Sequence, residues 1–213
     1  MKRQNVKLVA FDLDGTLIRG DTVLEVLAAN LGKLDRMREL ERTTSWFDLE
    51  AIERARQEVS GWFQGVPMET LLSYLPAATE APRAAEGIAM LREAGIKTAI
   101  VSITWEFAVE WFCTRFGIDY GVGAKLTDKG EIIHLWPDDK PKWLANLGGS
   151  LGLGLEQVAA VGDSGGDLAM LKAVGFPYFV GAQLPSEISH AVHMPDADIV
   201  LLAEHILSFS VSN

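Results

Sequence analysis

The chain has 213 residues, a formal net charge of −10 at pH 7 and a hydrophobic share of 48%. This length suggests one domain, or one core domain with a sizeable insertion, and the apolar share is enough to build a core. The excess of carboxylates argues against a nucleic-acid partner, since phosphate backbones are bound by clusters of Lys and Arg. The single cysteine, Cys113, excludes an intramolecular disulfide. Because no signal-peptide core or membrane-spanning stretch is visible, we expect a soluble, cytoplasmic protein without a membrane partner.

Short apolar segments rich in β-formers recur along the chain. We expect strands at Val6–Phe11, Lys97–Val101, Gln157–Val161, Tyr178–Val180 and Asp198–Leu202. Helical patterns lie between them at Ala84–Ala94, Glu106–Phe116, Pro141–Leu151 and Asp167–Val174. A glycine follows each of these helices, as expected where a helix ends in the left-handed conformation. The alternation predicts an α/β fold with a Rossmann-like parallel sheet that is covered by helices on both sides.

The stretch from residue 17 to residue 82 breaks this alternation. It contains no convincing strand but several amphipathic helical patterns, among them Thr22–Leu31, Leu34–Thr43 and Leu49–Trp62. These patterns predict a helical cap domain over 17–82, inserted after the first strand. The core domain would then consist of residues 1–16 and 83–213.

Two glycine-containing segments need separate interpretations. In Gly121–His134, the residues Asp128-Lys129-Gly130 separate two short strand-like segments, which is typical of a hairpin. The segment Gly148–Gly154 is similar to a nucleotide-binding loop, but it follows a predicted helix and precedes a predicted strand. This is the wrong order for a dinucleotide fingerprint, so we interpret the segment as a flexible connection.

Polar clusters that could carry chemistry follow the predicted strands. They are Asp12-Leu13-Asp14-Gly15-Thr16, Ser102-Ile103-Thr104, Lys140 and Gly162-Asp163-Ser164-Gly165-Gly166-Asp167. Each has an ordinary explanation alone: a turn capped by Asp, a serine that caps a helix, a surface lysine and a capped turn. In open parallel sheets, however, ligands bind just beyond the carboxyl ends of strands, and such clusters can converge on one site.

The order of these clusters resembles the haloacid dehalogenase (HAD) superfamily. In that order, DLDGT ends the first strand, a serine ends the second, a lysine follows, and GDSGGD ends a further strand. Within the superfamily the chain is most similar to the phosphoserine phosphatase-like enzymes. The resemblance covers residues 6–17 and about 84–205, and it includes the helical cap and the hairpin. It implies the HAD fold and a Mg²⁺-dependent phosphoric monoester hydrolase that forms an aspartyl-phosphate.

The resemblance implies catalytic roles for two carboxylates. Asp12 would attack phosphorus as the nucleophile. Asp14 would protonate the leaving oxygen and then deprotonate the water that breaks the intermediate. A carboxylate and a phosphate repel each other by roughly 4 kcal/mol per charge pair at ~4 Å and an effective dielectric constant of about 20. Mg²⁺ and Lys140 would cancel this repulsion.

The remaining matched residues would bind phosphate and metal. Ser102, together with Ile103 beside it, and Lys140 would hold the phosphoryl oxygens. Asp163 would coordinate Mg²⁺ with Asp12 and the backbone carbonyl of Asp14. Asp167 would support this metal directly or through water.

The chain departs from the phosphoserine phosphatases that it resembles. It has Gly15 where they usually have Ser, Asp21 where they have Glu, and Ile103 followed by Thr where they have Gly-Gly. Asp21 would still meet a substrate ammonium, and Arg56 of the cap a substrate carboxylate; the alternative is that both are surface charges on helices. The bulky Ile103 and Trp105 beside the phosphate site suggest a reshaped pocket, so phosphoserine is only a candidate substrate.

Several other conspicuous residues are interpreted as structural. Aromatic residues in the cap either pack its helices or line the substrate pocket; they are Trp46, Phe47, Trp62 and Phe63. His190 and His193 fall in a segment interpreted as an exposed loop, without further ligand candidates for a metal. Cys113 is interpreted as an inert core thiol.

The expected function is hydrolysis of a small phosphomonoester, with a small phosphorylated metabolite as the partner and Mg²⁺ as the cofactor. Two alternatives stay open. A phosphotransferase would pass the phosphoryl group to a second metabolite through the same intermediate, and a catalytically idle metabolite-binding protein would only keep the fold. No oligomeric state is predicted.

Overall fold

The central feature of the fold is a seven-stranded sheet. The computed structural model describes residues 5–44, 48–127 and 129–209. In this part of the chain the strands run in the order β6-β5-β4-β1-β7-β8-β9. Their bounds are β6 Ile132–Ile133, β5 Tyr120–Leu126, β4 Lys97–Trp105, β1 Leu8–Phe11, β7 Val158–Gly162, β8 Phe176–Phe179 and β9 Val192–His193. All neighbouring pairs are parallel except β5 with β6, so the predicted α/β class and Rossmann-like sheet are confirmed.

Strand β1 lies in the middle of the sheet and fixes the place of the polar clusters. All four of its residues are buried, as expected for a central parallel strand that is covered on both faces. Its last residue, Phe11, pairs with Ile100 of β4 on one side and with Val161 of β7 on the other. The residues that follow these three positions therefore lie next to one another, at the carboxyl ends of the parallel strands.

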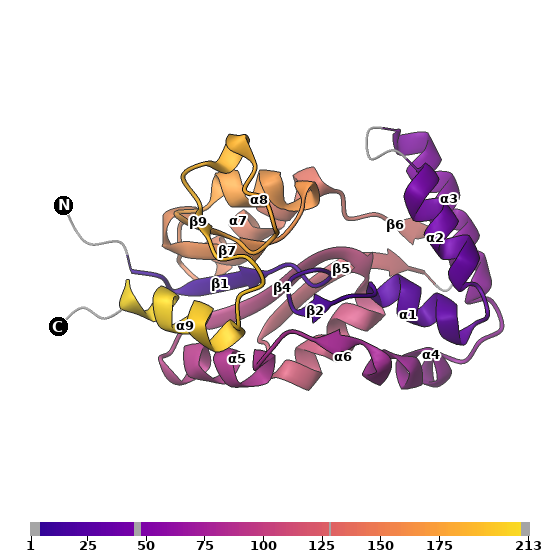
Figure 1. Ribbon diagram of the computed structural model, residues 1–213, viewed down its shortest axis with the longest axis horizontal. Helices are drawn as coiled ribbons and strands as arrows, with labels where there is room; N and C mark the ends of the chain where they lie inside the picture. Colours follow the sequence, from indigo (N-terminus) through magenta and orange to yellow (C-terminus); the bar gives the residue numbers. More distant parts are fainter. Residues whose placement is uncertain (1–4, 45–47, 128, 210–213) are drawn as a thin grey trace.

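Helices cover both faces of the sheet (Figure 1). One face carries α5 (Ala84–Glu93), α6 (Glu106–Phe116) and α9 (Ile199–Ser208), and the other carries α7 (Lys140–Ser150) and α8 (Leu168–Ala173). The alternation of β1 divides its side chains between the two faces: Val9 and Phe11 pack on the α5, α6 and α9 side, whereas Leu8 and Ala10 pack on the α7 and α8 side. Both faces of the strand are thus apolar, which explains its unbroken hydrophobic sequence.

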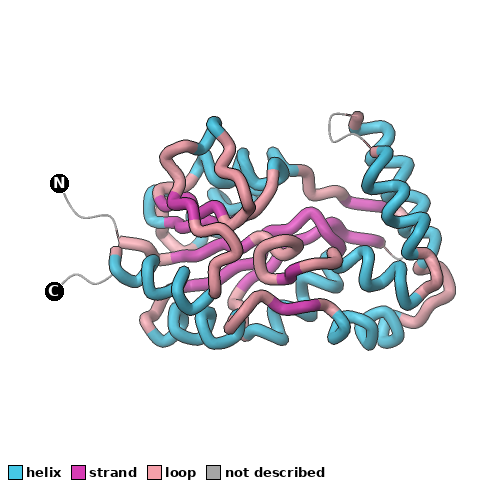
Figure 2. Tube along the Cα trace, in the orientation of Figure 1, coloured by secondary structure: helices cyan, strands magenta, loops and turns pink. Residues whose placement is uncertain are grey.

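Residues 17–82 are called the helical insertion below, and their described part, 17–44 and 48–82, lies mainly at one end of the sheet, on the right in Figures 1 and 2. Its helices are α1 Val23–Asn30, α2 Leu34–Thr43, α3 Leu49–Trp62 and α4 Met68–Tyr74. Thr22 caps α1 through a reciprocal pair of hydrogen bonds with Glu25. A two-stranded antiparallel ribbon, β2 (Ile18–Arg19) with β3 (Thr79–Glu80), joins the two ends of the insertion. Two-residue strands are too short to show a period in the sequence.

Short 3₁₀ helices complete the described structure. They are η1 Leu75–Ala77, η2 Pro137–Asp139, η3 Leu155–Gln157, η4 Gly165–Asp167 and η5 Ser186–Ile188. The predicted hairpin is present, since β5 and β6 pair through Lys125 and Ile133. Its turn residue Asp128 lies outside the described residues, and so do the cap aromatics Trp46 and Phe47.

The structure corrects two predictions about elements. The segment Asp198–Leu202, predicted as a strand, is the start of helix α9. Asp198 caps this helix by accepting a hydrogen bond from the backbone N–H of Val200 at 2.8 Å. A short run of Ile, Val and Leu cannot by itself distinguish a buried strand from a buried helix. Strand β4 also continues to Trp105, so that Ser102 lies inside a strand rather than at the start of a helix.

The glycines that follow the predicted helices do not all act in the same way. Gly95, Gly117 and Gly152 adopt the left-handed conformation expected of helix ends. Gly175 does not, and its role is spatial: a Cβ at this position would lie 2.4 Å from the backbone oxygen of Glu156. Gly175 therefore permits a close approach between two loops.

Two helical glycines offer a matched test of the packing between α5 and α9. A Cβ on Gly87 of α5 would lie 2.5 Å from the Ile199 carbonyl oxygen, whereas nothing lies within 4 Å of a Cβ on Gly149 of α7. We expect Gly87→Ala to lower the free energy of unfolding by about 1–3 kcal/mol through overpacking. Gly149→Ala should raise it by roughly 0.5–1 kcal/mol. Urea denaturation of both variants measures this difference, and an equal effect of the two would contradict the packing described.

Candidate active site

The candidate active site lies at the carboxyl ends of β1 and β7. Asp12 directly follows β1, and Asp163 directly follows the neighbouring strand β7. Asp167 is the last residue of η4, and Lys140 is the first residue of α7. One carboxylate oxygen from each of Asp12, Asp163 and Asp167 lies within 4.8 Å of the others. The structure thus brings four of the predicted site residues together.

Lys140 is the charged centre of this cluster. Its side chain is fully buried, and its Nζ donates to Asp12 Oδ1 at 2.7 Å and to Asp167 Oδ1 at 2.6 Å. Burial disfavours the ammonium, but the negative charges of the two carboxylates outweigh this effect and raise the pKa of Lys140. The interpretation of Lys140 as a surface lysine is therefore excluded.

The carboxylates around Lys140 carry more negative charge than one ammonium can balance. Burial and repulsion by Asp167 raise the pKa of Asp12 well above its usual range, although Lys140 opposes the rise. For the same two reasons the pKa of Asp163 rises to about 6. Converging carboxylate oxygens with uncompensated charge are the donor set that hard divalent cations prefer, so these residues fit Mg²⁺.

Asp167 also organises the loop that carries Asp163. Its Oδ2 accepts hydrogen bonds from the backbone N–H groups of Asp163 at 3.1 Å and Ser164 at 3.2 Å. Its other oxygen meets Lys140, so both oxygens have partners within the protein. This arrangement suits a residue that positions its neighbours.

Gly15 allows the loop that follows β1 to approach Asp163, in the loop that follows β7. Its φ of 81° lies in the left-handed region, and a Cβ would lie 2.2 Å from Asp163 Oδ2. Next to it, Thr16 donates from Oγ1 to Asp163 Oδ1 at 3.3 Å. On the other side of the turn, the guanidinium of Arg19 donates to the Gly15 carbonyl, a contact that the sequence analysis missed. The contacts of Gly15 and Thr16 with Asp163 hold the two loops against each other, and the Arg19 contact braces the loop that follows β1.

Asp14 lies where the core meets the helical insertion. Its Oδ1 accepts a hydrogen bond of 2.7 Å from the backbone N–H of Val23, the first residue of α1. Burial raises the pKa of Asp14 to about 6, although this hydrogen bond opposes the rise. Its side chain does not belong to the carboxylate group that converges among the described residues. The side chain of Asp14 is therefore not one of the three that converge, and only its backbone carbonyl stays a predicted metal ligand.

Ser102 and Ile103 lie in β4, beside β1. Ser102 is buried, and its Oγ accepts a hydrogen bond of 3.4 Å from the backbone N–H of Thr104. Because Ile100 pairs with Phe11, Ser102 stands two residues beyond the pair and Asp12 one residue beyond it. The structure therefore places Ser102 at the same edge of the sheet as Asp12.

The two expected substrate contacts from the insertion differ in environment. Asp21 is on the surface, with 59% of its side chain exposed, and pairs with Arg38 at 3.1 Å. Arg56 of α3 is half-buried, and burial lowers its pKa to about 10. It forms no ion pair with any residue that the structure describes.

The partners of Arg56 come from strand β4 and from the loop that follows β6. Arg56 Nη2 donates to the backbone oxygen of Ile103 at 2.8 Å, and Nη1 lies 3.1 Å from His134 Nδ1. Its guanidinium carbon is 5.4 Å from the centre of the Trp136 ring. Sequence analysis did not single out His134 or Trp136, because neither belongs to one of the four clusters.

The other conspicuous residues take structural positions. Phe63 packs edge-on against Trp105, with ring centres 5.8 Å apart, at the boundary between insertion and core. Trp62 is half-buried and packs against the hydrophobic core that contains Phe63 and Trp105. The Cys113 thiol donates to the Tyr120 carbonyl at 3.3 Å, and burial raises its pKa to about 12.

The two histidines of the C-terminal part are also accounted for. His190 is exposed, whereas His193 belongs to β9 and contacts the Gly181 carbonyl at 2.8 Å through Nε2. A predicted exposed loop is thus partly an edge strand.

Comparisons with known proteins show which family the chain belongs to. The profile of the haloacid dehalogenase-like hydrolase family matches residues 9–172. The phosphoserine phosphatase of Methanocaldococcus jannaschii is 27% identical over 178 residues, covering 79% of this chain and 82% of the relative. That of Archaeoglobus fulgidus matches with the same identity, but the chain spans only 51% of its length. A solved phospho-aspartyl intermediate analogue of phosphoserine phosphatase superposes with a TM-score of 0.76 at 23% identity, covering 96% of this chain and 99% of the other.

The chain belongs to the haloacid dehalogenase-like hydrolase family. This membership, the fold and the phosphoserine phosphatase relatives confirm the family resemblance and the enzyme class predicted from the sequence, a phosphoric monoester hydrolase. No helix of the described ranges is long and apolar enough to cross a membrane. A location in the cytoplasm stays a prediction.

Two nearby lysines test the importance of the buried charge. Lys140→Met should lower the free energy of unfolding by about 3–5 kcal/mol, since Asp12 and Asp167 lose their shared buried partner. Lys142→Met serves as the control, because Lys142 is exposed and pairs with Asp139 at the surface. Denaturation at pH 8 without divalent metal compares the two variants. Equal stability of both variants would show that the buried ion pairs are not as described.

Proposed function

We propose that this enzyme is a Mg²⁺-dependent phosphatase that hydrolyses a small phosphomonoester through a phosphoryl intermediate on Asp12. The observation that carries the proposal is the contact between Asp12 and the buried ammonium of Lys140, beside Asp163. An ammonium at this place favours the ionised form of Asp12, which is the nucleophilic form. It also attracts the phosphate that Asp12 has to approach.

In the first step an oxygen of Asp12 attacks phosphorus, and the bond from phosphorus to the leaving oxygen breaks. Ser102 and Lys140 orient the phosphoryl oxygens. Mg²⁺, when bound by Asp12, Asp163 and the backbone carbonyl of Asp14, supplies positive charge that offsets the charge of the phosphoryl group. Asp167 supports this arrangement through the loop that it organises.

Asp14 donates a proton in the first step and accepts one in the second. In its neutral form it donates a proton to the leaving oxygen, and the resulting carboxylate then accepts a proton from the water that attacks the phosphoryl group on Asp12. The pKa of about 6 that burial gives Asp14 makes both forms accessible near neutral pH. The second step releases phosphate and restores Asp12.

The helical insertion acts as a cap in this proposal, and residues 1–16 and 83–213 form the core domain. The hydrogen bond from Val23 to Asp14 supports this role, because it ties the first helix of the insertion to a proposed catalytic residue. A cap that closes over the site excludes water during the first step and admits small substrates.

Site-directed variants test the catalytic roles. With p-nitrophenyl phosphate and Mg²⁺, Asp12→Asn should reduce turnover to background, and Asp14→Asn should lower kcat by about 10²–10⁴-fold. Removal of Mg²⁺ with a chelator should abolish turnover. Asp138→Asn is the control, because Asp138 is exposed and is not one of the ion-pair partners of Lys140. Undiminished turnover by Asp12→Asn would refute the proposal, and transfer of phosphate to added alcohols would indicate a phosphotransferase instead.

Phosphoserine is the candidate substrate, supported by the relatives and by Arg56, which has no carboxylate partner among the described residues. If Arg56 binds the substrate carboxylate, kcat/KM for phosphoserine should exceed that for phosphoethanolamine by about 10–100-fold. Phosphoglycolate, which keeps a carboxylate but lacks the ammonium, separates this contribution from that of Asp21. Since Asp21 is exposed and paired with Arg38, we expect it to contribute little. Equal values of kcat/KM for phosphoserine and phosphoethanolamine would exclude recognition of the carboxylate.

A further inference from the structure

Arg56 connects the helical insertion to strand β4 of the core and to the loop that follows β6. It lies on α3, and its hydrogen bond to the Ile103 carbonyl reaches the residue that follows Ser102. Its contact with His134 reaches the segment that leads from β6 to Lys140. Figure 1 shows β6 beside α3, at the end of the sheet that carries the insertion. One side chain of the insertion therefore contacts the residue after Ser102 and the segment that leads to Lys140.

The contact with Arg56 determines the protonation state and the tautomer of His134. A guanidinium has only donors, so the Nδ1 atom that faces Arg56 has to accept the hydrogen bond. His134 is therefore neutral, with its proton on Nε2. Its ring stacks on Trp136, with centres 4.6 Å apart and an interplanar angle of 15°, and Trp136 in turn lies under the guanidinium.

We propose that His134 and Trp136 are positioning residues that hold Arg56 on the Ile103 carbonyl and so keep the insertion closed over the phosphoryl site. The proposal rests on the proposed function of that site. His134 and Trp136 act through Arg56 and lie outside the four clusters of the catalytic machinery. Closure of this kind favours substrate binding, so its loss is expected in KM more than in kcat.

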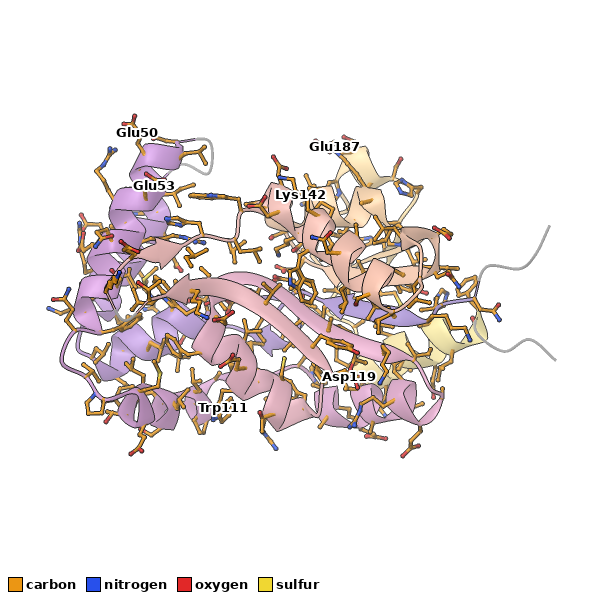
Figure 3. The ribbon with its side chains drawn as sticks, turned by 180° about the vertical axis from the view of Figure 1, so that it is seen from behind. Glu50, Glu53, Trp111, Asp119, Lys142 and Glu187 are labelled. Atoms are coloured by element: carbon orange, nitrogen blue, oxygen red, sulfur yellow. The ribbon has the colours of Figure 1, made fainter. Side chains whose placement is uncertain are left out.

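The contact depends on the protonation of His134. Protonated imidazole has no acceptor and would repel the guanidinium, so the contact forms only when His134 is neutral. Burial and the charge of Arg56 lower the pKa of His134, whereas Glu53, also on α3, opposes this effect. Among the described residues, Arg56 and Glu53 are the charged groups that act on the pKa of His134, and Figure 3 shows Glu53 along α3. The contact is thus present at neutral pH and is lost as the pH falls through the lowered pKa.

Two substitutions at position 134 separate this role from a general structural one. His134→Asn keeps an acceptor oxygen near the place of Nδ1 but does not titrate, and His134→Leu removes the acceptor. With p-nitrophenyl phosphate and saturating Mg²⁺ at pH 7.5, we expect KM to rise by about 10-fold in His134→Leu and to stay near the wild-type value in His134→Asn. As the pH falls from 7.5 through the lowered pKa of His134, KM of the wild type should rise relative to that of His134→Asn. Titration of the substrate affects both proteins equally, so it cancels in the ratio of the two KM values.

Variants of Trp136 and of the exposed His190 complete the set of experiments. Trp136→Leu should raise KM as His134→Leu does, and Trp136→Phe should restore most of the wild-type value. His190→Leu, at an exposed position, should leave KM unchanged. If KM of His134→Leu equals that of the wild type, or if the wild type and His134→Asn share one pH dependence, the proposal is overturned.

Hydrogen exchange tests the same contact without any activity. Amides of α3 should exchange faster in His134→Leu than in the wild type or His134→Asn at pH 7.5, because closure no longer protects the helix. Exchange at one rate in all three proteins would also overturn the proposal. Failure of the phosphatase proposal has a different signature: the wild type would lack Mg²⁺-dependent turnover while the exchange difference remained.

Discussion

The site depends on one buried interaction, the ammonium of Lys140 between the carboxylates of Asp12 and Asp167. Each of these groups would be costly to bury alone, and together they are stable only because their geometry allows short charge-assisted hydrogen bonds. The interaction also sets the charge around the proposed nucleophile. It keeps Asp12 beside a positive charge at the end of the central strand, and Asp163 on the next strand leaves negative charge that a divalent cation can balance.

The boundary between the core and the helical insertion brings the rest of the machinery to this centre. Asp14 meets the first helix of the insertion at Val23, and Arg56 meets the core at Ile103 and His134. Both contacts lie beside residues proposed to handle the phosphoryl group. Movement of the insertion would therefore change the surroundings of Asp14 and of the phosphate-binding residues at once.

Apolar periodicity was sufficient to predict the parallel sheet, because buried strands and the helices between them follow local rules. The role of Lys140 was implied only by the resemblance to the HAD superfamily, since a lysine beside two aspartates has no local signal of burial. Apolar periodicity failed at Asp198–Leu202, where a short apolar run fits a strand or a helix equally well and only the packing against α5 decides. It could not predict the contacts of Arg56 with His134 and Trp136 either. These residues lie far apart in sequence, and their contact depends on how the insertion is placed against the core.

The central claim is that Asp12 becomes covalently phosphorylated. The most direct measurement is mass spectrometry of peptides from enzyme quenched in acid during turnover of a phosphomonoester with Mg²⁺. The account predicts one added phosphoryl group on the peptide that contains Asp12, and none in Asp12→Asn. Rapid turnover with no phosphorylated peptide, or with the phosphoryl group on another residue, would contradict it.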